Sequence, residues 1–264
     1  MMTAHASQKQ RQPALDAQGL FKSYGGVEAV AGMDLLLPYG RITGLIGPNG
    51  AGKTTLLNLV SGVERPSAGR TALSGRDVTG FPAHRLAALG LVRTFQICRD
   101  LGRLTVIENL LVARPRQTGE GVIGLLAHGR RVRNEEAAGV AQSRALLEQV
   151  DLWRLANEPA ASLSGGQKKL LELCRALMLS PQVVLLDEPA AGVAQALKEV
   201  LIATIRSLVA REITVLIVEH DLEMVASLCD HVYVMAGGRL LTEGAFDDVT
   251  RDRGVLEAYL GVKA

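Results

Sequence analysis

The nine residues from Gly47 to Thr55, GPNGAGKTT, constrain this chain more than any other stretch. They follow the apolar run Ile42–Ile46 and precede a second apolar run, Leu56–Val60, so the sequence predicts a strand, a glycine-rich loop and a helix. In such a loop the backbone N–H groups can turn inward around an anion, and the helix that follows adds the positive end of its dipole. The sequence therefore predicts a phosphate-binding site at this point.

The polar residues of the stretch suit a nucleotide. Lys53 is expected to reach the β- and γ-phosphates, and the Thr54 hydroxyl is expected to bind Mg²⁺. The alternative is an ordinary glycine-rich turn before a helix, with an accidental lysine and two threonines. The predicted nucleotide contacts of the loop are Asn49, Gly50, Ala51, Gly52, Lys53, Thr54 and Thr55.

The amino-acid composition indicates what kind of core surrounds this loop and what kind of surface the chain lacks. Of 264 residues, 48% are hydrophobic but only 3% are aromatic, so the core is built of Leu, Val, Ala and Ile, which suits buried parallel strands. A net charge of only +2, from 29 basic and 27 acidic residues, argues against a broad nucleic-acid surface. The length allows a core domain with an inserted subdomain.

The ends and the cysteines suggest where the chain works. Residues 1–13 are predicted to be a frayed tail, because Met1–Gln12 is polar and lacks the apolar core of a secretory signal. No apolar run approaches the length of a membrane span, so any work at a membrane would go through partners. Cys98, Cys174 and Cys229 are scattered, which predicts reduced core thiols rather than disulfides or metal ligands.

The pattern of strands and helices divides the chain. Residues 14–96 and 181–264 alternate strands with helices, whereas residues 97–180 are mainly helical, with a charged stretch at 130–136 that predicts a solvated helical face. The sequence thus predicts an α/β core interrupted by a helical subdomain.

Two more apolar runs end in polar residues, as Ile42–Ile46 does. Val183–Leu186 leads into Asp187 and Glu188, and Ile213–Val218 leads into the segment of His220. Because ligands bind beyond the carboxyl ends of strands in an open parallel sheet, we expect the three ends to share one site.

Each of these polar residues has an expected role. Asp187 would hold Mg²⁺ through water, and Glu188 would orient and deprotonate an attacking water. His220 would form a hydrogen bond with the γ-phosphate. The alternatives are an ordinary strand-to-loop turn at Asp187–Pro189 and a structural histidine, but their co-occurrence with the phosphate loop favours a site.

A second helix start carries a different signal. Ser164 is a good N-cap and Gly165-Gly166-Gln167 exposes backbone N–H groups, which predicts another anion site without a lysine. The alternative is a plain capped helix. The apolar side of this helix is predicted to be Leu170, Leu173, Cys174 and Leu177.

Ser164-Gly165-Gly166-Gln167, shortly before Asp187-Glu188-Pro189, resembles the signature motif of ABC-type ATPases. The resemblance covers nearly the whole chain and implies a P-loop NTPase core with a mainly parallel sheet, an antiparallel β subdomain and an inserted helical subdomain. It further implies ATP hydrolysis in a homo- or heterodimer, in which residues 164–167 of one protomer close on the ATP of the other.

The resemblance also implies roles for three more positions. Tyr24 is similar to the aromatic residue that stacks on adenine, although it could equally be a hairpin aromatic. Gln96 is similar to the glutamine that reaches the metal and the water and links to the transporter. His220 matches the switch histidine. The implied catalytic set is Lys53, Gln96, Glu188 and His220, and the implied metal ligands are Thr54, Gln96 and Asp187.

Longer stretches resemble the ATPases of branched-chain amino acid importers. These stretches are Arg93–Gln96, Leu104–Leu110, Glu188–Val193, the insertion at 117–136 and the ending Ala258–Gly261. The implied partners are a second ATPase subunit, transmembrane permease subunits and, indirectly, a solute-binding protein, at the cytoplasmic face of the cell membrane. ATPases for urea, amides and lipopolysaccharide export are close alternatives.

One position departs from the family. Ala194-Gln195 stands where the family has Asp or Asn followed by Pro. We therefore expect either weaker coupling between the two ATP sites or a partner subunit that supplies the missing contact. A soluble ATPase acting on DNA or ribosomes is a rival, but the chain has one cassette and no heptad run, and we expect no nucleic-acid partner. A non-catalytic regulatory module is a third possibility, against which the intact Lys53, Asp187, Glu188 and His220 argue.

Overall fold

The computed structural model describes residues 12–94, 102–115 and 129–260. The chain forms two compact units. The first unit comprises Met1–Gln96, Gln182–Pro189 and Ile205–Ala264, and the second comprises Ile97–Pro181 and Ala190–Thr204. Each unit is considered on its own below.

The first unit contains a six-stranded sheet. Neighbouring strands are parallel, except for the antiparallel hairpin formed by the last two strands of the chain. In spatial order its strands are β10 (Arg239–Gly244), β9 (His231–Ala236), β3 (Ile42–Ile46), β8 (Thr214–Val218), β7 (Val183–Asp187) and β6 (Leu91–Arg93). Every residue of β3, β7 and β8 is buried, as expected for parallel strands covered on both faces.

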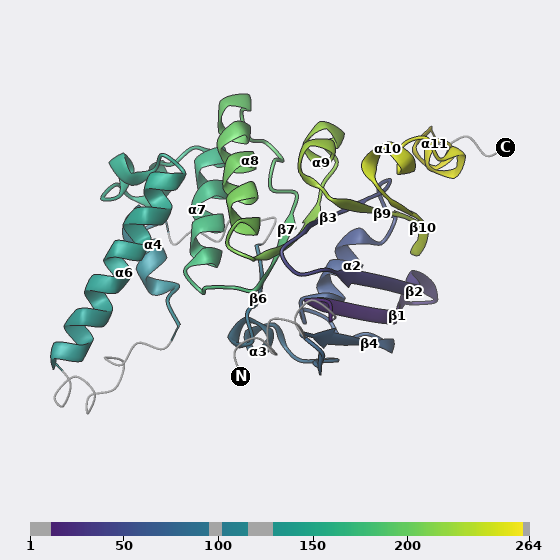
Figure 1. Cartoon of the computed structure of the whole chain (residues 1–264), viewed down its shortest axis with the longest axis horizontal. Coiled ribbons are helices and arrows are strands. Elements are labelled where there is room, and N and C mark those ends of the chain that lie inside the picture. Colours follow the sequence, from purple (N-terminus) through teal and green to yellow (C-terminus); the bar gives the residue numbers. More distant parts are fainter. Residues whose placement is uncertain (1–11, 95–101, 116–128, 261–264) are drawn as a thin grey trace. The chain divides into compact units, whose positions relative to one another are not determined.

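A four-stranded antiparallel sheet completes the β structure of this unit. Its order is β2 (Val27–Leu37), β1 (Leu15–Tyr24), β4 (Ala68–Leu73) and β5 (Arg76–Asp77), and Figure 1 shows β1, β2 and β4 side by side. One apolar cluster joins residues of both sheets, including Leu35, Leu45 and Leu216, to Leu56 and Leu57 of the helix after β3. The predicted mainly parallel core with an antiparallel β subdomain is therefore confirmed.

Helices follow strands in the described part of the first unit, as the predicted alternation of strands and helices requires. They are α2 (Lys53–Val60), α3 (Ala83–Ala88), α9 (Leu222–Leu228), α10 (Phe246–Val249) and α11 (Arg253–Leu260). Strand β6 ends at Arg93, and Phe95 and Gln96 lie outside the described residues.

The second unit is helical, as predicted. Its helices α4 (Val106–Val112), α6 (Gly129–Gln149) and α7 (Gly165–Leu177) pack against one another (Figure 1), with the short turns η2 (Trp153–Leu155) and η3 (Ala160–Ser162) between α6 and α7. The charged stretch at 130–136 and the apolar stretch after it form one helix, α6. Helix α8 (Gln195–Val209) begins in this unit and ends in the first.

Two of the predicted core thiols are described, and both are free. Burial raises the pKa of Cys174 and of Cys229 to about 12, so both thiols stay protonated at neutral pH. Cys98 lies outside the described residues. Over residues 12–94, 102–115 and 129–260, no helix has both the length and the apolar character needed to cross a bilayer.

Candidate functional site

Two glycines fix the course of the loop between β3 and α2. Gly47 has φ +149° and Gly52 has φ +98°, both in the region that favours glycine. A Cβ at Gly47 would overlap the carbonyl oxygen of Met235 in β9, and one at Gly52 would overlap that of Ala29 in β2. Only glycine fits either position, because the loop lies directly against the backbone of two other strands.

The turn between β9 and β10 holds the same loop by hydrogen bonds. The Gly238 N–H donates to the Ala51 carbonyl over 3.0 Å, and the Ala31 N–H donates to the Gly238 carbonyl over 2.8 Å. Gly238 therefore joins the backbone of β2, the loop between β3 and α2, and the β9–β10 hairpin in one interlocked set of hydrogen bonds.

Lys53 is the first residue of α2, and its side chain curls back into the loop. It is only 6% exposed, and its Nζ donates to the carbonyls of Gly47 over 2.7 Å and Pro48 over 3.0 Å. Burial lowers the pKa of Lys53, while the negative charges of Glu188 and Asp187 raise it. The ammonium group thus lies inside the loop, within the field of the two carboxylates.

The other predicted loop contacts differ in exposure. Asn49, Gly50 and Thr54 are exposed, Gly52 and Thr55 are half-buried, and Ala51 is buried. The Thr54 hydroxyl is therefore accessible in the first turn of α2, on the solvent side of the loop.

The three predicted strand ends do share one edge. In the parallel ladder Leu45 pairs with Val218, and Val218 pairs with Asp187. The carboxyl ends of β3, β8 and β7 are therefore level with one another, as the sequence predicts.

Asp187 is buried and carries an ion pair that the sequence does not reveal. It is 3% exposed, and its Oδ2 lies 2.8 Å from Arg93 Nη2 at the end of β6. Arg93 Nη1 also donates to Asn58 Oδ1 over 2.7 Å and to Ser61 Oγ over 3.2 Å, which ties α2 to the strand ends. The sequence shows a basic residue, Arg93, at the end of an apolar strand. It does not show that Asp187 is the partner of Arg93, because that depends on the pairing of β6 with β7.

Glu188 and His220 face each other across the strand ends. Glu188 Oε1 lies 3.1 Å from His220 Nε2, and Glu188 has the left-handed φ of +46°, which turns its side chain off the strand. The neighbouring Glu219 is 3% exposed, and its Oε2 accepts hydrogen bonds from the N–H groups of His220, over 2.9 Å, and of Asp221, over 3.3 Å. Glu219 therefore holds the backbone that positions the histidine, a role that sequence reasoning missed.

The oxygen ligands available here suit Mg²⁺. The Thr54 hydroxyl and the Asp187 carboxylate are hard oxygen donors, and Mg²⁺ is commonly held by one or two such groups together with phosphates and water. No group of three or more His, Cys, Asp or Glu side chains in the described part of the chain could hold a metal ion. The Thr54 and Asp187 oxygens therefore fit an Mg²⁺ ion that phosphates and water also bind.

The structure does not place two of the predicted residues in this cluster. Gln96 lies outside the described residues. Tyr24 is 45% exposed at the end of β1; its hydroxyl donates to Glu64, and Lys22 Nζ lies 5.3 Å from its ring centroid. The Tyr24 ring is exposed enough to stack on adenine, and its position also suits a structural aromatic residue of the β1–β2 hairpin.

In the second unit, Ser164 begins α7 with a capping box. Its Oγ accepts from the Gln167 N–H over 3.3 Å, and Gln167 Oε1 accepts from the Ser164 N–H over 2.9 Å. Ser164 and Gly165 are exposed, while Gly166 is buried and its Cβ position would crowd Leu197 of α8. The four predicted core residues of α7, which are Leu170, Leu173, Cys174 and Leu177, are all buried.

Known proteins resemble this chain over nearly its whole length. The family model described as ABC transporter matches residues 30–191. A probable branched-chain amino acid transport ATP-binding protein of Archaeoglobus fulgidus, LivG, is 40% identical over 249 residues, covering 94% of this chain and 96% of the relative. The high-affinity branched-chain amino acid transport ATP-binding protein BraF of Pseudomonas aeruginosa is 38% identical over 254 residues, with 95% and 98% covered.

Solved structures extend the likeness to the fold. An ATP-binding cassette of an ABC transporter in its ADP conformation superposes with a TM-score of 0.82 at 36% identity. The superposition covers 95% of this chain and 100% of the other.

Proposed function

This chain belongs to the ABC transporter family, and we propose that its ATPase activity powers the import of branched-chain amino acids. One observation carries the proposal. Lys53, Asp187 and the Glu188–His220 pair converge at the carboxyl edge of three parallel strands, in a chain 40% identical to a relative named for that transport.

ATP would bind with its phosphates in the loop of residues 47–55. The Lys53 ammonium, now bonded to two loop carbonyls, would turn to the β- and γ-phosphates, and the N–H groups at the start of α2 would surround them. Tyr24 would stack on the adenine ring with its exposed face.

Hydrolysis would be a transfer of the γ-phosphoryl group to water. Glu188 would orient the water and accept its proton as the water oxygen bonds to the γ-phosphorus. The bond from that phosphorus to the bridging oxygen breaks, and ADP and phosphate leave. His220 Nε2 lies 3.1 Å from Glu188 Oε1, and with ATP bound His220 would donate a hydrogen bond to the γ-phosphate.

Mg²⁺ would be held by Thr54 and, through water, by Asp187, and Gln96 would be a further ligand. When bound, the ion would neutralise charge on the β- and γ-phosphates. Arg93 would act on this arrangement indirectly, because its guanidinium fixes one oxygen of the Asp187 carboxylate.

The working form would be a dimer of two ATPase subunits, identical or related. Residues 164–167 of one protomer would complete the phosphate site of the other, since Ser164 and Gly165 are exposed at a positive helix end. Ala194 and Gln195 would bridge the two sites less firmly than the family's usual polar residue.

The dimer would act on transmembrane permease subunits at the cytoplasmic face of the cell membrane, with a solute-binding protein as an indirect partner. The relatives named LivG and BraF support branched-chain amino acids as the solute. Urea, amides and lipopolysaccharide are the alternative cargoes that the test must separate.

The test is a reconstituted transporter. The chain is co-purified with its permease subunits, placed in lipid vesicles with the solute-binding protein, and assayed for ATPase activity and uptake of labelled solute. We expect leucine, isoleucine and valine to stimulate both, and urea or acetamide to stimulate neither. A Glu188→Gln complex, assembled equally well, should lose both signals. Stimulation by urea or an amide alone, or outward movement of lipopolysaccharide, would overturn the proposed solute.

A further inference from the structure

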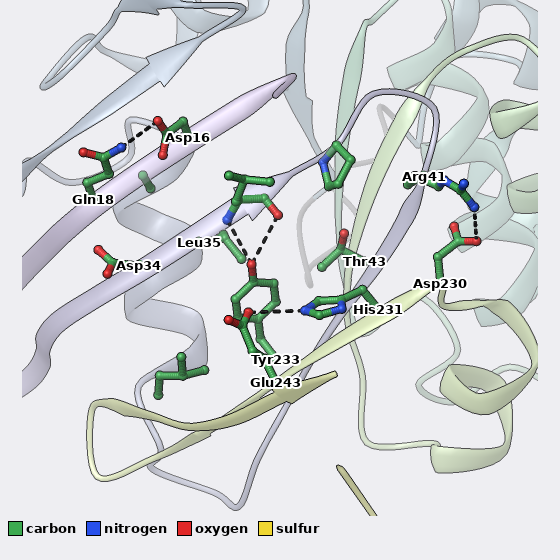
Figure 2. Close-up of a pocket in the computed structure, with 14 residues that line it drawn as sticks. Asp16, Gln18, Asp34, Leu35, Arg41, Thr43, Asp230, His231, Tyr233 and Glu243 are labelled. Carbon is green, nitrogen blue, oxygen red and sulfur yellow. Dashed lines mark hydrogen bonds and ion pairs between the residues drawn. The ribbon is translucent and has the colours of Figure 1, made fainter. Parts of the chain in front are cut away.

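A cavity of about 900 Å³ lies in the first unit, at the end of the strands opposite the phosphate loop. Arg41 and Thr43, at the start of β3, line it, whereas the loop that begins at Gly47 follows the other end of the same strand. Its other walls come from β1, β2, β9 and β10, with Pro38 after β2 and Asp230 before β9 (Figure 2). None of the residues assigned above to ATP or Mg²⁺ lines this cavity.

The wall of the cavity contains a hydroxyl group that the protein leaves unused. Thr43 is 1% exposed, and its Oγ1 is buried without a hydrogen-bond partner among the described residues. Figure 2 shows Thr43 at the cavity between Tyr233 and the Arg41–Asp230 pair. A buried hydroxyl normally finds a partner, so this orphan indicates a polar group that the cavity can receive.

Two of the four carboxylates at the cavity are already paired. Asp230 Oδ1 lies 3.0 Å from Arg41 Nη1, and Glu243 Oε2 lies 3.2 Å from His231 Nε2. These two contacts engage both basic side chains that line the cavity.

The other two carboxylates have no basic partner among the described residues. Asp34 Oδ1 accepts only a backbone bond, from the Gly19 N–H over 2.6 Å, and Asp16 Oδ2 accepts only from the Gln18 amide over 2.8 Å. Figure 2 shows Asp16 and Asp34 on the side formed by β1 and β2, away from the Arg41–Asp230 pair. The cavity therefore carries excess negative charge on one side.

Beside these acids the wall is apolar. Leu35 and Leu36 of β2 and Leu240 of β10 line the cavity, and Leu36 and Leu240 are 45% and 37% exposed. Exposed leucines beside unpaired carboxylates are suited to a ligand that joins a cationic head to a hydrocarbon body.

We propose that this cavity binds a small organic ammonium ion with an aliphatic body. The ammonium group lies against Asp34 and Asp16, the aliphatic body packs on Leu36 and Leu240, and a polar atom of the ligand bonds to the Thr43 hydroxyl. The ligand carries net positive charge, because both basic side chains of the cavity already contact a carboxylate and leave Asp34 and Asp16 without a basic partner among the described residues. This site is separate from the ATP site and does not depend on the proposed transport function.

Three probes with one carbon skeleton test the charge. The full chain is titrated by calorimetry with 3-methylbutylamine, a cation, with leucine, a zwitterion, and with 3-methyl-1-butanol, which is neutral. We expect the amine to bind at least about tenfold more tightly than the other two. Equal or tighter binding of leucine or of the alcohol, or no binding of the amine, would overturn the proposal.

Matched variants locate the binding. Asp34→Asn keeps the shape and the acceptor for the Gly19 N–H but removes the charge, and we expect about tenfold weaker amine binding. Thr43→Val removes the hydroxyl at constant shape and should weaken binding several-fold, while Thr43→Ser should restore it. Asp247→Asn, an exposed acid on α10 outside the cavity, should change nothing.

A separate measurement keeps the two proposals apart. Each variant is also titrated with a fluorescent ATP analogue, which reports folding and the distant phosphate site. Amine affinity that stays constant in Asp34→Asn and Thr43→Val, with ATP binding intact, would overturn the site even if the chain proves to be an importer ATPase.

Discussion

Helices α2 and α7 both begin at a glycine-rich sequence, but they differ in whether a side chain caps the first backbone N–H groups. Helix α2 has Gly52 at its N-cap, and no side chain there accepts a hydrogen bond. Helix α7 has Ser164 at its N-cap and a complete capping box with Gln167. One helix start thus leaves its donors for a ligand, whereas the other engages the N–H groups of Ser164 and Gln167 within its own capping box.

The difference assigns the two starts different tasks. A capping side chain stabilises a helix by about 1 kcal/mol, and α2 forgoes this stabilisation at the place where phosphate would bind. At α7 the Gln167 N–H is already engaged, although over the long distance of 3.3 Å. The comparison predicts that α2 binds nucleotide by itself, while α7 contributes only when a dimer closes.

The largest effect should come from Lys53→Ala. Because the buried ammonium is the positive charge inside the α2 loop, its loss should weaken ATP binding by about 100-fold or more in titrations with a fluorescent ATP analogue. Lys168→Ala, in the first turn of α7, is the matched control and should leave monomer affinity unchanged. If Lys53→Ala and Lys168→Ala lose the same ATP affinity, the prediction that only α2 binds nucleotide in the monomer is wrong.

Glu188→Gln should separate binding from hydrolysis. The amide keeps the shape of the side chain but cannot accept a proton, so ATP turnover should fall by about 100-fold or more while ATP affinity is kept. Size-exclusion chromatography with ATP should then show an accumulated dimer, the state in which α7 is expected to act. A variant that stays monomeric with ATP bound would contradict the sandwich arrangement.

Ser164→Ala should have a smaller effect, confined to the dimer. It removes the α7 cap, so we expect about 1 kcal/mol of lost stability and roughly tenfold slower ATP turnover, with unchanged monomer affinity for ATP. Thr105→Ala removes the equivalent capping box of α4 and serves as the control for stability. If both variants slow turnover alike, the effect of Ser164 is on folding alone.

Ala194→Asn should change least. The Ala194 carbonyl accepts from the N–H groups of Leu197 and Lys198, so position 194 is the N-cap of α8. Asparagine should stabilise that helix by about 1 kcal/mol and raise the cooperativity of ATP hydrolysis between the two sites. Ala194→Ser supplies a cap with a shorter side chain and should give the stability without the cooperativity. Unchanged cooperativity in Ala194→Asn would contradict the expected weak coupling of the natural chain.

Sequence was sufficient where the structure depends on neighbours along the chain. The strand β3, the loop at 47–55 and the Ser164 cap are local patterns, and each was predicted with nearly correct bounds. The Arg93–Asp187 ion pair joins residues far apart in the chain, and its prediction requires knowing that β6 lies beside β7. The same reason hides the Thr43 cavity, whose walls come from five strands of two sheets.

The interlocked backbone around Gly238 has a consequence for the rate and affinity of nucleotide binding. Ordering a loop residue costs about 1–2 kcal/mol of conformational entropy, and a loop that ATP had to shape would lose that amount from the binding free energy. Here β2 and the β9–β10 turn hold residues 47–52 in place through backbone contacts. Folding therefore orders the phosphate loop before any nucleotide arrives, and the contacts with β2 and the β9–β10 turn preorganise it.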